Sequence, residues 1–171
     1  MKEKTTKTIK DINIKTGLEK IVLNVGIGRF CNLPHFEEKV LPELIKNVES
    51  LTGQRPATCP AKQSIAGFKT REGNVVGLKV TLRGRRMIQF LEKLNQIVLP
   101  RIRDFRGLNL KSVDANGNLS FGIKEHIAFP EIIPEQTHHD LGVEITVVPK
   151  NRGRDEAIVL YRGVGVPLQK K

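Results

Sequence analysis

An alternation of apolar and polar side chains within residues 75–83, regular from Leu78 to Arg83, restricts the fold of this chain more than any other feature of its sequence. A two-residue period predicts a β-strand with one buried and one exposed face. Since the exposed face would carry cations and a hydroxyl, a sheet containing this strand needs a cover on its other face only. The apolar positions are Val76, Leu78, Val80 and Leu82, and the polar ones are Lys79, Thr81 and Arg83.

Other segments predict the partners of this strand. Apolar residues at helical spacing predict helices over 35–51 and 87–98, and a short third helix is expected over 156–161. Pro42 either marks the start of the regular helix near Val40 or kinks it, and Pro100 is expected to end the second helix. Further strands are predicted over residues 18–25, 61–68, 119–123 and 141–147, with residues 70–74 as a loop tip and 114–118 as a turn.

Each long helix has a single apolar stripe and can therefore cover only one face of the sheet. We expect an α+β fold with an antiparallel-rich mixed sheet of about five strands, helices on one face and the other face open for RNA. Lys20 and Asn24 join the polar residues of 75–83 on this open face. Residues 1–17 are expected to form a flexible basic arm, and residues 18–171 a single domain.

The charge of the chain points to a polyanionic partner. Its 29 Lys and Arg against 18 Asp and Glu give a net charge of +11. Residues 54–86 hold eight cations and one anion, whereas residues 125–144 hold five anions and no Lys or Arg. Nucleic acid is therefore the first expectation, a membrane surface the second and an acidic protein the third.

The remaining motifs favour binding over catalysis. Gly26-Ile27-Gly28 follows a strand, as in a nucleotide-dependent enzyme, but the third glycine is missing, so we expect a turn that uses positive φ at glycine. His138-His139-Asp140 has no nucleophile turn beside it, and no metal or cofactor is expected. The possible metal ligands lack the usual spacing and are Cys31, Cys59, His35, His126, His138 and His139. The two cysteines make no disulfide framework, which favours a reducing cytoplasm.

Two basic motifs remain candidates for RNA contact. Phe68, followed by Lys69 and Arg71, either stacks on a base or is a core residue at a strand end, and the sequence leaves both open. The segment 83–86, Arg-Gly-Arg-Arg, stands at the predicted start of a helix, where positive charge is unfavourable unless an anion binds. A basic adaptor on anionic membranes is the third hypothesis, but no basic amphipathic helix supports it and no apolar window spans a bilayer.

Several collinear blocks resemble the large-subunit ribosomal protein that binds 5S ribosomal RNA, the universal L-five family in its bacterial form. The resemblance covers roughly residues 18–148. The blocks are Ile-Val-Leu-Asn-Val-Gly-Ile-Gly (21–28), Gly-Gln-Arg-Pro (53–56), Ala-Lys-Gln-Ser-Ile-Ala-Gly-Phe-Lys (61–69), Lys-Val-Thr-Leu-Arg-Gly (79–84), Pro-Arg-Ile-Arg-Asp-Phe-Arg-Gly (100–107), Phe-Gly-Ile-Lys-Glu (121–125) and Phe-Pro-Glu-Ile (129–132).

The resemblance implies a non-enzymatic role in the central protuberance, with 5S ribosomal RNA bound by the sheet and its adjacent loops. The matching positions for ribosomal RNA are Asn24, Gln54, Lys62, Ser64, Thr81 and Arg83. It also implies that the loop 69–77, with Lys69, Arg71 and Asn74, reaches peptidyl-site (P-site) transfer RNA.

A second implied contact involves the acidic loop 130–141, which would touch the small-subunit head protein of the S-thirteen family. Its candidate residues are Glu131, Glu135, His138 and Asp140. Neighbouring 5S-binding proteins of the large subunit are further expected partners, and the expected location is the cytoplasm, on the ribosome.

Overall fold

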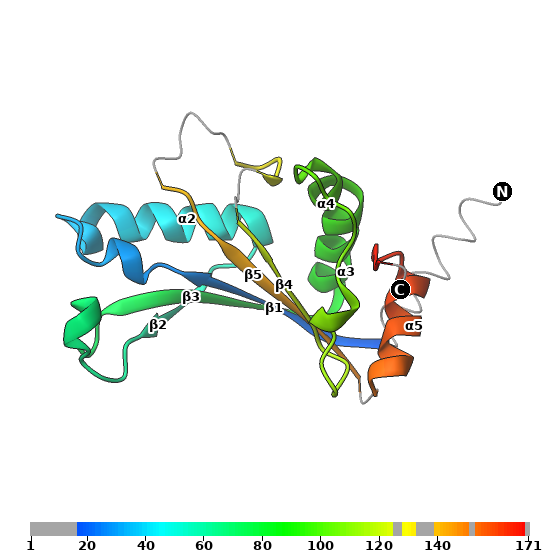
Figure 1. Ribbon diagram of the computed structural model, residues 1–171. Helices are drawn as coiled ribbons and strands as arrows, with labels where there is room; N and C mark the ends of the chain where they lie inside the picture. The colour runs from blue at the N-terminus through cyan, green and yellow to red at the C-terminus, as the bar shows by residue number, and fades with distance from the viewer. Residues whose placement is uncertain (1–16, 125–127, 133–138, 151–152, 170–171) are drawn as a thin grey trace. The chain divides into compact units, whose positions relative to one another are not determined.

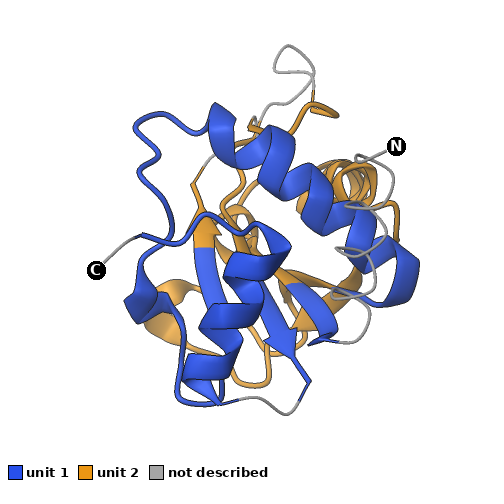
Figure 2. Cartoon of the chain, turned by 90° about the vertical axis from the view of Figure 1, so that its right-hand side faces the viewer, with its two compact units in different colours: residues 1–22, 81–121, 145–171 blue, residues 23–80, 122–144 orange. Residues whose placement is uncertain are grey.

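The computed structural model describes residues 17–124, 128–132, 139–150 and 153–169 of the chain. Its residues gather into two compact units, which Figure 2 shows in blue and orange. Unit 1 holds residues 1–22, 81–121 and 145–171, and unit 2 holds residues 23–80 and 122–144. The expected arm, apart from Gly17, lies outside the described residues. The expectation of a single domain over 18–171 stays a prediction.

The strands form one five-stranded sheet in the order β2-β3-β1-β5-β4 (Figure 1). The edge strand β2 pairs antiparallel with β3, placing Ala57 opposite Lys79 and Cys59 opposite Gly77. The fold is an α+β structure with an open antiparallel sheet, as the sequence predicts. The strands are β1 (Leu18–Gly26), β2 (Ala57–Pro60), β3 (Val75–Leu82), β4 (Leu119–Ile123) and β5 (Val143–Pro149).

The strand predicted over 61–68 is wrong. The chain pairs as β2 four residues earlier and then enters a hairpin loop, where Ile65 and Thr70 exchange backbone hydrogen bonds of 2.9 and 3.2 Å. A single 3-10 turn, Ala66–Phe68, reverses the chain at the tip. The tip of the loop therefore lies at 66–69 rather than at 70–74. The segment 61–68 is not a strand, because a segment that folds back onto itself cannot pair with a neighbouring strand.

Burial follows the predicted alternation in the two central strands. Leu78, Val80 and Leu82 of β3 are buried, whereas Lys79 is exposed and Thr81 half-buried. In β1, Ile21, Leu23 and Val25 are buried, while Lys20, Val22 and Asn24 are only half-buried. The apolar half of each strand therefore belongs to the core, and the polar half stays accessible to a partner.

In unit 2, the helix α2 (Leu41–Thr52) runs along one side of the sheet and buries Leu44, Val48 and Leu51 (Figure 1). A π-helical turn, Phe36–Val40, precedes it. Pro42 stands in the first turn of α2, where its missing N–H costs no hydrogen bond, so the regular helix starts next to the proline instead of being kinked by it. Gly53 ends α2 with φ of 65°.

Unit 1 contains the second predicted helix, which begins earlier and ends later than expected. It consists of α3 (Gly84–Lys93), a π-helical turn Leu94–Val98 and α4 (Leu99–Arg101). Pro100 lies in the first turn of α4 and does not stop the helix; the chain leaves it at Ile102. The buried stripe consists of Met87, Ile88, Phe90, Leu91, Leu94, Val98 and Leu99.

The short third helix is longer than predicted and holds a buried tyrosine. Helix α5 spans Arg154–Val164, and the Tyr161 side chain is fully buried. Its hydroxyl donates towards the carbonyls of Gly117, at 2.7 Å, and Val147, at 3.0 Å. Gly117 belongs to the predicted turn, which Asp114 closes by accepting from the backbone N–H of Asn118 at 2.7 Å. One hydroxyl thus connects α5 to this turn and to β5.

Replacing Tyr161 by Phe should destabilise the protein by about 1–3 kcal/mol, because two buried carbonyls lose their donor. Burial also raises the pKa of the Tyr161 phenol, so its contribution is lost as the pH rises past the ordinary tyrosine value of about 10. Urea unfolding of the Tyr161→Phe chain measures the effect. Val159→Ala, on the exposed side of α5, is the control and should change stability by less than about 0.5 kcal/mol. Equal stability of the two variants would contradict this role.

Candidate RNA interface

The polar face of β3 presents hydrogen-bond donors in a row. Lys79, Thr81 and Arg83 are three alternate positions, and Arg83 directly precedes α3. On the neighbouring strand β1, Lys20 and Asn24 occupy the equivalent face. Ammonium and guanidinium groups suit phosphates, while amide and hydroxyl groups suit riboses and base edges. The strands thus position the predicted residues Asn24, Thr81 and Arg83 on polar faces.

Glu19 moderates the cations on this face. Arg83 Nη1 lies 3.1 Å from Glu19 Oε1, and Lys20 Nζ lies 3.4 Å from the same oxygen. The hydrogen bond from Arg83, followed by the charge of Lys20, lowers the pKa of the Glu19 carboxyl. The carboxylate therefore stays ionised at neutral pH, and a phosphate that binds Arg83 has to compete with it.

Sequence reasoning missed Glu19, because this residue is 64 positions away from Arg83 in the chain. The pairing of β1 with β3 brings them together. The sequence around Glu19 and Lys20 contains no local pattern that indicates the ion pair between Glu19 and Arg83.

The start of α3 gathers three exposed arginines, Arg83, Arg85 and Arg86. Gly84 has φ of 58°, which most residues disfavour, and this lets the strand turn directly into the helix. The first turn of α3 contains no acidic residue of its own, and the carboxylate that pairs with Arg83 at this helix start is that of Glu19 in β1. The sequence interpretation of the segment as an anion-facing corner stays a prediction.

The loop between β2 and β3 carries five of the predicted residues. Lys62, Ser64, Lys69 and Arg71 are all exposed. The Ser64 hydroxyl accepts a hydrogen bond from the backbone N–H of Glu72 at 2.9 Å, and so it also braces the loop. Asn74 is half-buried where the loop enters β3, so only 69–74 of the predicted 69–77 segment is loop.

Gln54 follows the glycine that ends α2, and it is half-buried. The backbone carbonyl of Gln54 accepts a hydrogen bond from the Thr52 hydroxyl, and the backbone N–H of Gln54 donates to the oxygen of that hydroxyl. This local bonding fixes the backbone of Gln54 where the chain leaves the helix for β2.

The acidic segment is described in part. Glu131 and Asp140 are exposed, whereas Glu135 and His138 lie outside the described residues. The His139 ring lies 5.0 Å from the buried Phe30 ring, centroid to centroid, and the guanidinium of Arg29 lies 4.6 Å from the centre of that Phe30 ring. The end of the acidic segment is therefore held against the turn that follows β1.

The Gly26-Ile27-Gly28 turn differs from the expectation. Neither glycine has positive φ. The Ile27 N–H donates to the Val76 carbonyl at 3.0 Å, and a 3-10 turn, Gly28–Phe30, follows. The segment thus continues the pairing with β3 and needs no left-handed residue.

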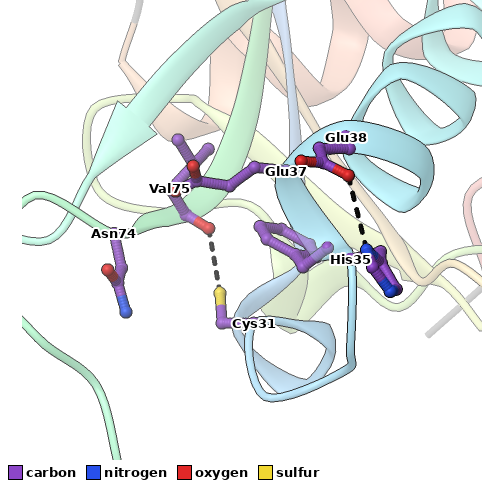
Figure 3. A pocket seen from close by; sticks show the side chains of 7 residues that line it. Cys31, His35, Glu37, Glu38, Asn74 and Val75 are labelled. Carbon is purple, nitrogen blue, oxygen red and sulfur yellow. Dashed lines mark hydrogen bonds and ion pairs between the residues drawn. The ribbon is translucent and has the colours of Figure 1, made fainter.

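An open pocket of about 410 Å³ in unit 2 is lined by both Cys31 and His35 (Figure 3). The Cys31 thiol donates to the Val75 carbonyl at 3.0 Å, and burial raises its pKa. His35 faces Glu38, with Nδ1 3.3 Å from Oε2. Throughout the part of the chain that the structure describes, no three His, Cys, Asp or Glu side chains converge as a metal site would require.

None of the described helices is both long and apolar enough to cross a lipid bilayer.

Comparison with known proteins covers nearly the whole chain. The family model described as ribosomal protein L5 matches residues 14–71, and the model of the C-terminus of the same ribosomal family matches residues 75–168. The chain is 44% identical over 154 residues to the "Large ribosomal subunit protein uL5" of Colwellia psychrerythraea, covering 90% of this chain and 83% of that protein. The protein of the same name from Mycoplasma pneumoniae is 46% identical over 153 residues, with the same coverage.

Replacing Glu19 by Gln should strengthen binding to polyanions, since the change removes the carboxylate that competes for Arg83 and Lys20. A surface ion pair is worth up to about 1 kcal/mol, so the gain should not exceed roughly fivefold. Elution from heparin at higher salt would register it. Glu156→Gln makes the same change in net charge at an exposed carboxylate of α5 that does not pair with Arg83 or Lys20, and it is the matched control. If both variants elute together, net charge alone explains the effect.

Proposed function

Because this chain belongs to the ribosomal protein L5 family, we propose that its polar sheet face binds 5S ribosomal RNA. The members of this family are structural, non-enzymatic constituents of the large ribosomal subunit. By this contact the protein helps to attach 5S ribosomal RNA in the central protuberance. The main observation that supports this proposal is the row Lys79, Thr81 and Arg83. These side chains are accessible because the alternate residues of β3 are buried.

Charge and hydrogen-bonding chemistry support this assignment. A compact RNA helix offers phosphates and 2′-hydroxyls across a shallow groove, and a polar sheet can contact both. Lys62, Arg83 and the arginines after it would bind phosphates, while Asn24, Gln54, Ser64 and Thr81 would bond to sugars and base edges. This division predicts an affinity that depends on salt through the cations and on RNA structure through the amides and hydroxyls.

Two further contacts belong to the proposal. The exposed cations Lys69 and Arg71, with Asn74 behind them, suit the backbone of P-site transfer RNA. The acidic segment 130–141 suits a basic protein, and we assign it to the small-subunit head protein of the S-thirteen family. Glu131 and Asp140 would supply the charges, together with Glu135 and His138 outside the described residues. Other 5S-binding proteins would adjoin the same RNA, on ribosomes in the cytoplasm.

The combined change Thr81→Ala and Arg83→Ala should weaken 5S ribosomal RNA binding by about 1.5–3 kcal/mol, roughly ten- to a hundredfold, since a charge-assisted hydrogen bond is lost. The dependence of log affinity on log salt should also become shallower by about one unit. Mobility-shift titrations over a range of salt concentrations measure both. Arg162→Ala removes an exposed charge on α5, outside the residues assigned to the interface, and should leave the affinity unchanged. Wild-type binding to an unrelated hairpin as tight as to 5S ribosomal RNA would refute specific recognition.

The combined change Lys69→Ala and Arg71→Ala should leave 5S ribosomal RNA binding within about twofold but weaken retention of P-site transfer RNA, because only the loop cations are removed. Large subunits assembled with wild-type or variant protein can be compared for dissociation of bound transfer RNA after sedimentation has shown that the protein is incorporated. Lys39→Ala plus Lys46→Ala, before and within α2, removes equal charge elsewhere. Unchanged transfer RNA dissociation would argue against this contact.

A further inference from the structure

Phe68 is the exception among the seven phenylalanines of the chain. Its side chain is 75% exposed, the highest value among the large apolar residues in the described ranges. The other six, Phe30, Phe36, Phe90, Phe105, Phe121 and Phe129, are buried or half-buried. Of the two interpretations that the sequence left open, the one that places Phe68 in the core is therefore wrong. A phenyl ring kept in water forgoes the free energy of burial, and this ring is therefore available to a partner that could cover it.

The loop holds this ring in place by a ladder of hydrogen bonds. Ile65 and Thr70 pair through their backbones, and the Phe68 N–H donates to the Ile65 carbonyl at 3.3 Å. The Thr70 hydroxyl donates to the Phe68 carbonyl at 3.3 Å, and Lys69 has φ of 52°, which fixes the reversal. Lower in the loop, Ala61 N–H donates to the Asn74 carbonyl at 2.8 Å. The backbone that presents Phe68 is thus built before any partner arrives.

The surroundings of the ring define the chemistry of that partner. Lys62, Lys69 and Arg71 are exposed on the same loop, against one acidic residue, Glu72. The apolar area is small, since Ile65, 49% exposed, is the other large apolar residue of the described loop in contact with water. A partner with a flat apolar surface bordered by phosphates would match both the small apolar area and the surrounding cations. Nucleobases have such a surface, and they stack on aromatic side chains regardless of sequence.

We propose that Phe68 is a stacking platform for a nucleobase that an RNA partner leaves exposed at the end of a base stack. Lys69 and Arg71 hold the adjoining phosphates. This assignment rests on the proposed RNA-binding function and extends it to a residue that forms no part of the polar sheet face. An anionic membrane would also accept an aromatic among cations, but one ring beside one isoleucine buries little area in a bilayer, and the polar row of β3 follows this loop in the chain.

The absence of tryptophan from the sequence allows a direct test. The Phe68→Trp chain contains a single indole, whose fluorescence falls when a base stacks on it. Val159→Trp is the matched control, because Val159 is 72% exposed on α5. Transfer RNA and 5S ribosomal RNA are titrated separately at low salt, with inorganic polyphosphate as a polyanion without bases. We expect saturable quenching of the Phe68→Trp chain by at least one RNA, little quenching of the Val159→Trp chain and none by polyphosphate.

The two RNAs distinguish the source of the base. Quenching by transfer RNA assigns the platform to the contact proposed for the loop, and quenching by 5S ribosomal RNA assigns it to the ribosomal RNA itself. Either result supports the proposal. Binding of 5S ribosomal RNA in a mobility shift without quenching by either RNA overturns the stacking proposal and leaves the proposed function intact. Failure of 5S ribosomal RNA to bind refutes the proposed function, while quenching by transfer RNA would still support stacking.

A second pair of variants checks the energy of the stack. Phe68→Leu should weaken binding of the quenching RNA roughly fivefold to a hundredfold, whereas Phe68→Tyr should keep it within about twofold, because only the tyrosine retains a ring. Equal affinities of these two variants would contradict stacking. A fluorescence blue shift of the Phe68→Trp chain on phosphatidylserine vesicles, with quenching by neither RNA, would overturn the proposal in favour of a membrane surface.

Discussion

Burial of Leu78, Val80 and Leu82 on one face of β3 determines where the polar residues of that strand point. Because side chains alternate, a shift of one residue would place Lys79 and Arg83 in the core and expose the leucines. The free energy of burying the apolar face therefore also fixes the orientation of the polar row. The backbone of this row needs no separate ordering when a partner binds, so that only the side chains lose conformational freedom on association.

The cations of the interface are balanced as well as concentrated. Glu19 accepts from Arg83 and lies beside Lys20, so the free protein does not hold two unscreened like charges at this point of the sheet. Exposed ion pairs of this kind contribute little to stability, but they oppose indiscriminate binding of polyanions. A structured RNA that also bonds to Thr81 or Asn24 overcomes the competition more easily than a featureless chain of phosphates. In the proposed interface, specificity and salt dependence would therefore be set by different side chains of the same face.

The basic loop and the described ends of the acidic segment are supported by different contacts. The β2–β3 loop is braced by its own hydrogen bonds, among them the Ser64–Glu72 contact. The acidic segment is attached at His139, which packs against Phe30. Opposite charges on the basic loop and on Glu131 and Asp140 are consistent with the proposal that one segment contacts RNA and the other a basic protein.

The limits of the sequence prediction show in particular elements. Alternation identified β1 and β3, and helical spacing identified α2 and α3, since both patterns record burial along a single element. The segment 61–68 was taken for a strand because its apolar residues resemble one, yet backbone pairing between Ile65 and Thr70 makes it a hairpin. Ala57–Pro60 became the strand instead, with a pairing supplied by β3 that its own composition does not indicate.

By itself, the sequence determined which side chains share a face, because local periodicity is written in the order of residues. It also determined the charge imbalance and the resemblance that led to the ribosomal L5 family. Only the tertiary structure decided that β1 lies beside β3, that Glu19 meets Arg83 and that Phe68 projects into water. These outcomes depend on hydrogen bonds and contacts between residues far apart in the chain, or on a chain reversal, and no local pattern encodes them.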